Sequence, residues 1–233
     1  MASYTQGNSV SYTLEKASAL DAYVCDHLLP TDPALEAALK NNEASSLDAI
    51  DVAPNQGKQL YLLAKIIKAK RILEVGTLGG YSAIWFAKAV SPEGKVITLE
   101  LEPEHAKVAR KNIANAGFEK VVEVKVNPAL QTLAEMQKEG TEAFDLVFID
   151  ADKQNNPGYF TAALAMSHVG TLIVVDNIAR RGRLIDADSK DGDVVGTRKL
   201  FEMMGKEKRV EATAVQTVGS KGWDGYAMAL VVE

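Results

Sequence analysis

The spacing of apolar residues changes after the first 68 residues. In residues 1–68 apolar side chains recur at helical spacing, and Pro30, Pro33 and Pro54 interrupt the pattern. A proline ring clashes with the preceding helical turn, so each proline marks the edge of a helix. Residues 59–69 carry the last such pattern, an amphipathic helix. We therefore expect an N-terminal segment of several short helices.

From residue 70 short β-branched strands alternate with helical segments. The predicted strands are 71–75, 95–100, 121–126, 144–150 and 171–176, and the predicted helices between them are 82–90, 103–116, 129–139 and 158–167. Strands this apolar, each followed by a helix, imply a parallel sheet covered on both faces. After an irregular polar stretch and a helix at 195–204, strands 210–218 and 225–232 have no helix between them. We expect these two to pair antiparallel.

This order of elements predicts the fold class. It is a Rossmann-like α/β fold with a mostly parallel seven-stranded sheet, a C-terminal antiparallel hairpin and helices on both faces. With 233 residues, the chain suits one domain, because domains beyond roughly 250 residues tend to split. We expect this domain to span 1–233, with a helical segment at 1–68 and a Rossmann-like core at 69–233. The fold class alone decides no function.

Composition and charge narrow the environment and the partners. The net charge is −5 and there is no block of Lys and Arg, which argues against binding to nucleic acid or to an anionic membrane. No run reaches about 18 apolar residues, so no membrane span is expected, and the first residues lack a signal-peptide pattern. The single cysteine, Cys25, excludes an internal disulfide and is expected to be a packing residue. We expect a cytoplasmic protein.

A glycine-containing turn follows the first predicted strand. In ILEVGTLGGYS the glycines are Gly76, Gly79 and Gly80, a spacing that differs from the G-x-G-x-x-G of dinucleotide sites. Glu74, just before this turn, would repel a pyrophosphate but can accept a hydrogen bond from a cationic amino-acid group. Glu100 ends the second strand, where an acid can accept both hydroxyls of a ribose. The pattern favours a nucleoside carrying an amino acid over NAD(P).

Polar side chains end the fourth and fifth predicted strands. Asp150, Asp152 and Lys153 follow one, and Asp176 and Asn177 follow the other. Such positions meet at the carboxyl edge of the sheet, and oxygen-only ligands suit Mg²⁺ or Ca²⁺ rather than Zn²⁺. Clustered acids repel each other unless a positive charge lies between them, which the lysine and a metal would supply. The alternative role for Asp152 and Asn177 is helix capping.

Other polar and aromatic positions leave alternatives open. His27, His105 and His168 are expected in surface or capping roles. Trp223 would either line a substrate pocket or pack on the hairpin. The acidic stretch 186–193 would be either a substrate lid or a solvated loop.

From Ala53 to its C-terminus the chain resembles the cation-dependent O-methyltransferases, the group that contains caffeoyl-CoA and catechol O-methyltransferases. It is most similar to their small microbial and fungal members. The resemblance is carried by ILEVGTLGGYSA, VITLELEPEHA, DLVFIDADK, VVDN and QTVGSKGWDG. It implies the S-adenosylmethionine-dependent methyltransferase fold, with S-adenosylmethionine and a divalent cation as cofactors. Mg²⁺ is the expected cation, with Ca²⁺ or Mn²⁺ as alternatives, and a homodimer is the expected assembly.

The resemblance also implies roles for particular residues. The cofactor site would comprise Val52, Glu74, Gly76, Thr77, Ser82, Glu100, Ala129, Asp150 and Asp152. The metal would be held by Asp150, Asp176 and Asn177, and Lys153 would act with Asp150 in catalysis. Departures from the pattern are Asn156 and Pro157, where many relatives have a tyrosine, and Leu130, where catechol enzymes have a glutamine. We also find no counterpart of the acid with which those enzymes orient the second hydroxyl.

The predicted activity is transfer of a methyl group from S-adenosylmethionine to a hydroxyl of a small aromatic molecule. A bound cation would lower the pKa of that hydroxyl, and Lys153 would accept the proton or stay charged and stabilise the oxyanion. The acceptor is expected to be a catechol-like compound or its CoA ester, with flavonoids and other secondary metabolites also fitting. The alternatives are a cofactor-binding module without catalysis and an NAD(P)-dependent oxidoreductase.

Overall fold

The computed structural model describes residues 13–233, and its first elements are three helices. They are α1 (Leu14–Leu28), α2 (Pro33–Ala44) and α3 (Pro54–Ile66). The side chain of Asp32 caps α2 by accepting the backbone N–H groups of Ala34 and Leu35. Proline begins both α2 and α3, because the first helical residue needs no intrahelical N–H bond. For this reason α3 starts five residues before the helix predicted at 59–69.

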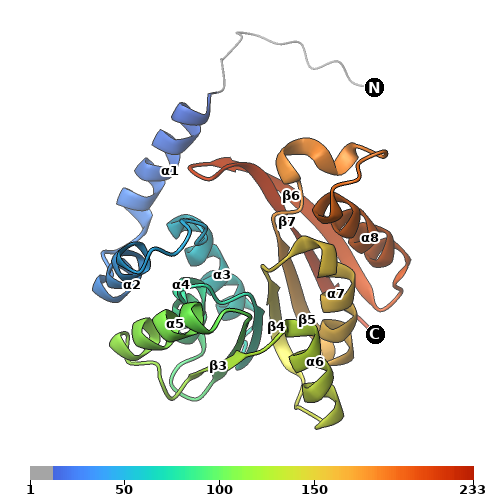
Figure 1. The fold of residues 1–233 in the computed structure, drawn as a ribbon, viewed down its shortest axis with the longest axis horizontal. Coiled ribbons are helices and arrows are strands. Elements are labelled where there is room, and N and C mark those ends of the chain that lie inside the picture. Colours follow the sequence, from blue (N-terminus) through green and yellow to red (C-terminus); the bar gives the residue numbers. More distant parts are fainter. Residues whose placement is uncertain (1–12) are drawn as a thin grey trace.

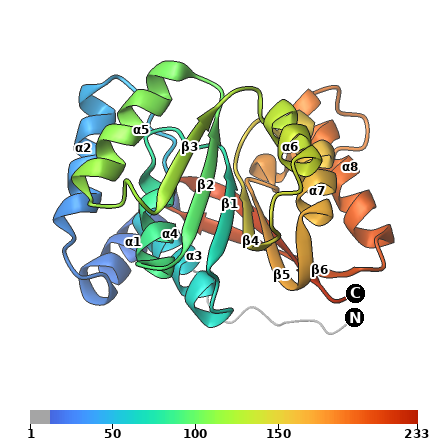
Figure 2. The same cartoon turned by 90° about the horizontal axis from the view of Figure 1, so that it is seen from below.

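A seven-stranded sheet forms the centre of the molecule. Its strands are β1 (Arg71–Val75), β2 (Lys95–Glu100), β3 (Val122–Val126), β4 (Phe144–Ile149), β5 (Ser167–Asp176), β6 (Val210–Gly219) and β7 (Gly222–Val231). The spatial order is β3-β2-β1-β4-β5-β7-β6, as Figures 1 and 2 show. The first five strands run parallel, whereas β7 pairs antiparallel with both β5 and β6. The predicted parallel sheet with a C-terminal hairpin is confirmed.

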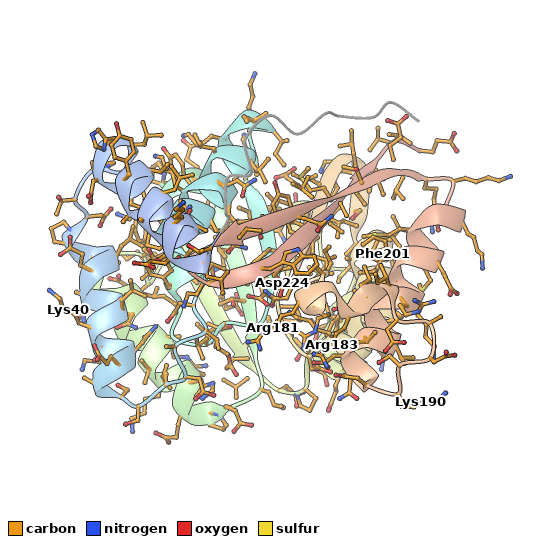
Figure 3. All side chains as sticks on the ribbon, turned by 90° about the horizontal axis from the view of Figure 1, so that it is seen from above. Lys40, Arg181, Arg183, Lys190, Phe201 and Asp224 are labelled. Carbon is orange, nitrogen blue, oxygen red and sulfur yellow. The ribbon has the colours of Figure 1, made fainter. Side chains whose placement is uncertain are left out.

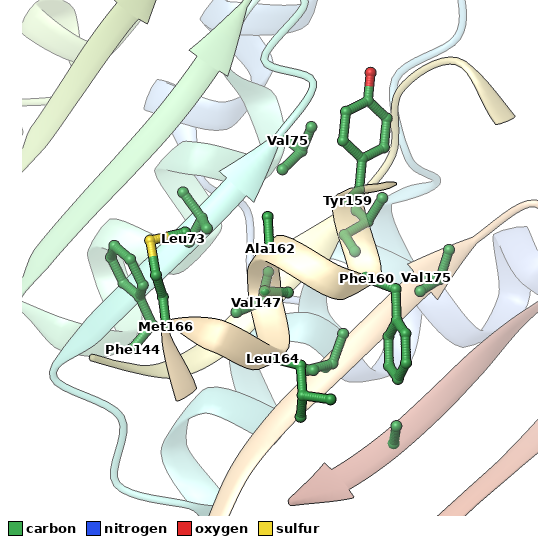
Figure 4. Packing of buried hydrophobic residues seen from close by; sticks show 14 of the residues in the cluster. Leu73, Val75, Phe144, Val147, Tyr159, Phe160, Ala162, Leu164, Met166 and Val175 are labelled. Atoms are coloured by element: carbon green, nitrogen blue, oxygen red, sulfur yellow. The ribbon is translucent and has the colours of Figure 1, made fainter. Parts of the chain in front are cut away.

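Helices cover both faces of this sheet. One face carries α4 (Tyr81–Val90) and α5 (Pro103–Asn115) with α3, and the other carries α6 (Ala129–Lys138), α7 (Asn156–Ala165) and α8 (Gly192–Lys206). Alternate residues of β1 serve the two sides: Leu73 and Val75 pack in one apolar cluster and Ile72 in the other. Figure 4 shows side chains of the first cluster, which joins Leu73 and Val75 of β1 to Tyr159 and Phe160 of α7. Both strand faces are therefore buried, as the near-continuous apolar strands predicted.

The region before the fifth strand differs from the prediction. β5 begins at Ser167 instead of residue 171, and α7 spans Asn156–Ala165, so the helix predicted at 158–167 starts and ends two residues too late. Phe144 pairs with Ser167 while Leu146 pairs with Leu172, so β5 bulges between these pairs. Gly170 has φ of +96° inside the bulge. Apolar periodicity does not reveal such an insertion, because the extra residues have no partners across the strand.

Two short 3₁₀ helices, η1 (Lys153–Asn155) and η2 (Arg180–Ile185), lie in segments that follow β4 and β5. α8 begins at Gly192, three residues before the predicted start. Within residues 13–233, every helix is too short or too polar to cross a bilayer.

Candidate functional site

A cavity of about 830 Å³ opens at the carboxyl ends of the parallel strands. Most of the predicted cofactor and catalytic residues line it: Val52, Gly76, Thr77, Ser82, Glu100, Ala129, Asp150, Asp152, Lys153 and Asn177. They come from loops that are far apart in sequence and meet because parallel strands end at one edge of the sheet. We refer to this space as the first cavity.

Gly76 allows the ends of β1 and β4 to approach closely at the floor of the first cavity. Its φ is +101°, a conformation that residues with a Cβ rarely adopt. A Cβ at this position would lie 2.0 Å from the carbonyl oxygen of Asp150. The turn therefore requires glycine both for its backbone conformation and for space.

Glu74 lies behind the first cavity instead of lining it. It is fully buried, and its two oxygens accept hydrogen bonds from Ser82 Oγ at 2.5 Å and Thr98 Oγ1 at 2.6 Å. Burial raises the pKa of Glu74 to about 8, although the two hydroxyls oppose the shift. Ser82 donates its only hydroxyl hydrogen to Glu74. Its oxygen, at the cavity surface, can therefore only accept a hydrogen bond from a ligand. Ser82 thus presents a site for a cationic group.

Glu100 ends β2 with its carboxylate held by four backbone N–H groups. One oxygen accepts from Thr77 and Leu78 at 3.2 and 2.7 Å, and the other accepts from Leu101 and Glu102, both at 3.0 Å. These bonds fix the carboxylate at the cavity wall. A carboxylate has about four acceptor positions. A ligand that binds Glu100 would therefore share these positions with the four backbone N–H groups.

His105 also belongs to this wall, which the sequence analysis did not predict. Its Nδ1 lies 3.6 Å from Oε1 of Glu100, and its ring lines the first cavity. The available signal was its place in the first turn of a helix that follows an acid-ended strand. His27 and His168 are exposed, as expected, but His168 belongs to β5 and contacts Asp145 at 2.9 Å instead of ending a helix.

Asp152 points into the first cavity with two side-chain partners. Tyr159 OH donates to Oδ1 at 2.5 Å and Asn155 Nδ2 donates to Oδ2 at 2.6 Å. Burial, followed by the neighbouring carboxylate, raises the pKa of Tyr159. Tyr159 therefore brings a phenol to this wall.

The candidate metal ligands are divided between the first cavity, which Asp150 lines, and a second one; because Asn177 lines both, we call this place the junction of the two cavities. The second cavity measures about 360 Å³, Asp176 lines it, and Asn177 lines both. Asp150 Oδ1 accepts a hydrogen bond of 2.7 Å from Lys153 Nζ, and Lys153 and Asp176 are each 5% exposed. Asn177 has φ of +55°, a strained conformation of the kind that clusters at functional sites.

These residues fit a hard divalent cation. Among residues 13–233 no three His, Cys, Asp or Glu side chains are grouped to hold a metal, so the candidate set is two carboxylates and one amide. Burial, and then the charge of Asp150, raise the pKa of Asp176. One lysine offsets only part of this negative charge, and a cation with oxygen ligands would offset the rest.

The second cavity is formed by the end of β5, by the QTVGSKGWDG segment of the hairpin, and by helix residues that the sequence did not single out. Its polar lining includes Asp21, Asn55, Gln56, Gln59, Asp176, Asn177, Lys221, Asp224 and Tyr226. Asp21 of α1 joins the hairpin turn to the helices, accepting from Asn55 Nδ2 at 2.9 Å and from the N–H of Ser220 at 2.8 Å. The N-terminal helices and the C-terminal hairpin therefore build this space together.

Trp223 lines neither cavity. Its ring packs against Gly182, where a Cβ would lie 2.7 Å from the ring, and its Nε1 donates to Gln216 at 3.0 Å. Of the two roles considered, hairpin packing describes it. Asp224 beside it accepts the N–H of Ala179 at 3.0 Å, which holds η2 close to the hairpin (Figure 3).

The acidic stretch 186–193 is tied to η2 by ion pairs. Arg183 contacts Asp191 at 2.6 Å and Arg180 contacts Asp193 at 2.7 Å. Arg180 and Asp193 also line the first cavity.

Cys25 is half-buried on α1, and burial raises the pKa of its thiol.

Two features define an S-adenosylmethionine-dependent methyltransferase. One is the strand order, in which β7 lies antiparallel between β5 and β6. The other is the glycine turn after β1, which Glu74 precedes. A family model described as O-methyltransferase matches residues 30–228. The chain belongs to this O-methyltransferase family. The NAD(P)-dependent oxidoreductase considered from the sequence is thereby excluded.

Individual relatives agree with this assignment. A catechol O-methyltransferase of Mycobacterium tuberculosis is 50% identical over 212 residues, 91% of this chain and 94% of that protein. A catechol O-methyltransferase of Niastella koreensis is 46% identical over 91% of this chain and 96% of its own length. A crystal structure is known for an O-methyltransferase from Bacillus cereus in complex with SAH, and the sequence of that protein is 51% identical to this chain. It superposes with a TM-score of 0.93 over 94% of this chain and 100% of the other.

Proposed function

We propose that this O-methyltransferase methylates one hydroxyl of a catechol-like aromatic molecule with the help of a divalent cation, Mg²⁺, at Asp150, Asp176 and Asn177. The observation that carries the proposal is the place of these ligands at the junction of two cavities. The larger cavity has room for a nucleoside with an amino acid, and the smaller one suits a single ring. The junction is where a methyl donor and an oxygen acceptor would meet.

In the first cavity the cofactor would be held at both ends. Glu100 would accept hydrogen bonds from the ribose hydroxyls, which would share its two carboxylate oxygens with the four backbone N–H groups. Ser82 would accept a hydrogen bond from the ammonium of the methionine part, with Glu74 acting through the Ser82 hydroxyl. Ala129 would lie against the adenine, with Val52 packing nearby and Asp152 as a further contact.

At the junction the bound cation would act as a Lewis acid that stabilises the acceptor's oxyanion. Asp150, Asp176 and Asn177 would hold it. Lys153 lies 2.7 Å from Asp150, so its Nζ would be close enough to receive the hydroxyl proton or to balance the oxyanion's charge. The walls of the second cavity would keep the acceptor ring oriented toward the methyl group.

The proposal predicts a strict cation requirement. Aromatic compounds with two adjacent hydroxyls, assayed with S-adenosylmethionine, should be methylated in Mg²⁺ and lose at least about 100-fold in rate in EDTA. Added Mg²⁺ should restore the rate, and matching compounds with a single hydroxyl should react poorly. A rate that resists EDTA would contradict a catalytic cation.

A homodimer is the proposed assembly. No residue of α1 is buried in the single chain, and this helix exposes Leu14, Leu20, Tyr23 and Leu28 to at least 59% each. Apolar residues gathered on one element are typical of a surface that another protein covers. Light scattering should give twice the chain mass of 25.1 kDa, and Leu20→Glu with Tyr23→Glu should shift the population to monomer. A monomeric wild-type protein at micromolar concentration would disprove this assembly.

A further inference from the structure

A glutamine of α3 contacts one of the candidate metal ligands. Gln56 lies in the first turn of α3, and its Nε2 donates a hydrogen bond of 2.7 Å to Oδ2 of Asp176, 120 positions away in sequence. The other oxygen of Asp176 accepts the N–H of Asn177 at 2.8 Å. Both oxygens therefore have a protein partner, and the orientation of this buried carboxylate is set by the protein.

The helix that carries this glutamine is itself firmly placed. Gly57 packs so tightly on α4 that a Cβ there would lie 2.3 Å from Nε1 of Trp85. Gln59, on the next turn, donates from Nε2 to the hydroxyl of Tyr226 at 2.5 Å. Tyr226 is the partner of Asp176 in the register of β7 and β5. Two glutamines of one helix thus each bind one member of the same cross-strand pair.

The two candidate acidic ligands have partners of different charge. Asp150 shares its charge with the ammonium of Lys153 at 2.7 Å, whereas Gln56 is neutral. An amide N–H favours the ionised form of a carboxylate without cancelling its charge. Gln56 therefore orients the Asp176 carboxylate without placing a positive charge beside it. Groups that orient a ligating carboxylate in this way are worth about 10- to 100-fold in metal affinity or activity.

We infer that Gln56 is a positioning residue for the cation, acting through Asp176. The inference rests on the proposed function, because the cation is part of that proposal. Gln56 orients the carboxylate at the junction of the two cavities, and Gln59 with Gly57 keeps the helix in place for it. A purely structural glutamine would affect folding and leave metal affinity unchanged.

The test measures Mn²⁺ binding to the cofactor-free protein by electron paramagnetic resonance. Gln56→Met, which keeps length but lacks a donor, should raise the Kd for Mn²⁺ by about 10- to 100-fold. Gln59→Met, the same change one turn away, should alter it by less than about threefold, because its partner is a phenol that binds no metal. Both variants should bind S-adenosylhomocysteine like the wild type. If Gln56→Met fails to fold, Gln56→Asn, whose amide is one methylene too short, should show the same loss.

The outcomes separate this inference from the proposed function. If the wild-type protein binds Mn²⁺ and either Gln56 variant binds it equally well, the positioning role is wrong while the cation site stands. If the wild-type protein binds no Mn²⁺, or binds it no better than Asp150→Ala, the cation site itself is wrong. Loss of Mn²⁺ affinity in Gln59→Met equal to that in Gln56→Met would also overturn the role, since it would point to the helix as a whole.

Discussion

Replacing Asp150 by alanine is expected to lower the Mg²⁺-supported rate of methylation by roughly a thousandfold, which is about 4 kcal/mol of transition-state stabilisation. Asp150 is one of only two carboxylates proposed to hold the cation. Its loss would also leave Lys153, 5% exposed, without the anion that now lies 2.7 Å from its Nζ. The measurement is the initial rate over a titration of Mg²⁺, with saturating S-adenosylmethionine and catechol.

Cofactor affinity gives the control for this variant. The groups proposed to hold the ribose and the methionine ammonium, Glu100 at the end of β2 and Ser82 in α4, lie on other elements. The Kd for S-adenosylhomocysteine should therefore stay within about tenfold of the wild type, or 1.4 kcal/mol. Glu119→Ala removes an exposed carboxylate in the turn before β3 and should leave the rate unchanged. If Asp150→Ala kept a rate within tenfold of the wild type, the cation mechanism would be wrong.

The sequence predicted the sheet and the first cavity because both depend on local signals. Each strand is a short apolar run, and each candidate ligand follows such a run directly, as Asp150 follows β4 and Asp176 ends β5. Parallel strands bring their carboxyl ends to one edge, so position along the chain predicts position in space. The predicted start of β5 was wrong because the spacing of apolar residues does not reveal a β-bulge.

The helix side of the second cavity had no such signal. Asp21 and Gln56 are polar residues on helices and look like ordinary surface positions in the sequence. Only tertiary packing brings Gln56 to Asp176, across 120 positions. A sequence motif also does not show how deeply a side chain is buried. Glu74 was expected to touch the cofactor, and the structure places it fully buried behind Ser82.

The burial of Glu74 makes the stability of the cofactor-free protein depend on pH. Burial raises its pKa from an ordinary 4.5 to about 8, so the folded protein binds this proton more tightly than the unfolded chain does. The stabilisation from the bound proton is complete below about pH 4.5 and is lost as the pH rises through about 8. Across this range Glu74 would cost the folded state on the order of a few kcal/mol. Glu74→Gln, which cannot ionise, should remove this loss.

Melting curves of the cofactor-free proteins at pH 5.5 and pH 9 test this expectation. The Tm of Glu74→Gln minus that of the wild type should become more positive by several degrees at the higher pH, since about 1 kcal/mol shifts Tm by roughly 2–4 °C in a chain of this size. Glu119→Gln, at an exposed site, should show no such trend. The same Glu74 variant should bind S-adenosylhomocysteine about tenfold more weakly at pH 9, because a neutral amide no longer supports an ammonium at Ser82. A Tm difference that is the same at both pH values would mean that Glu74 does not ionise within this range.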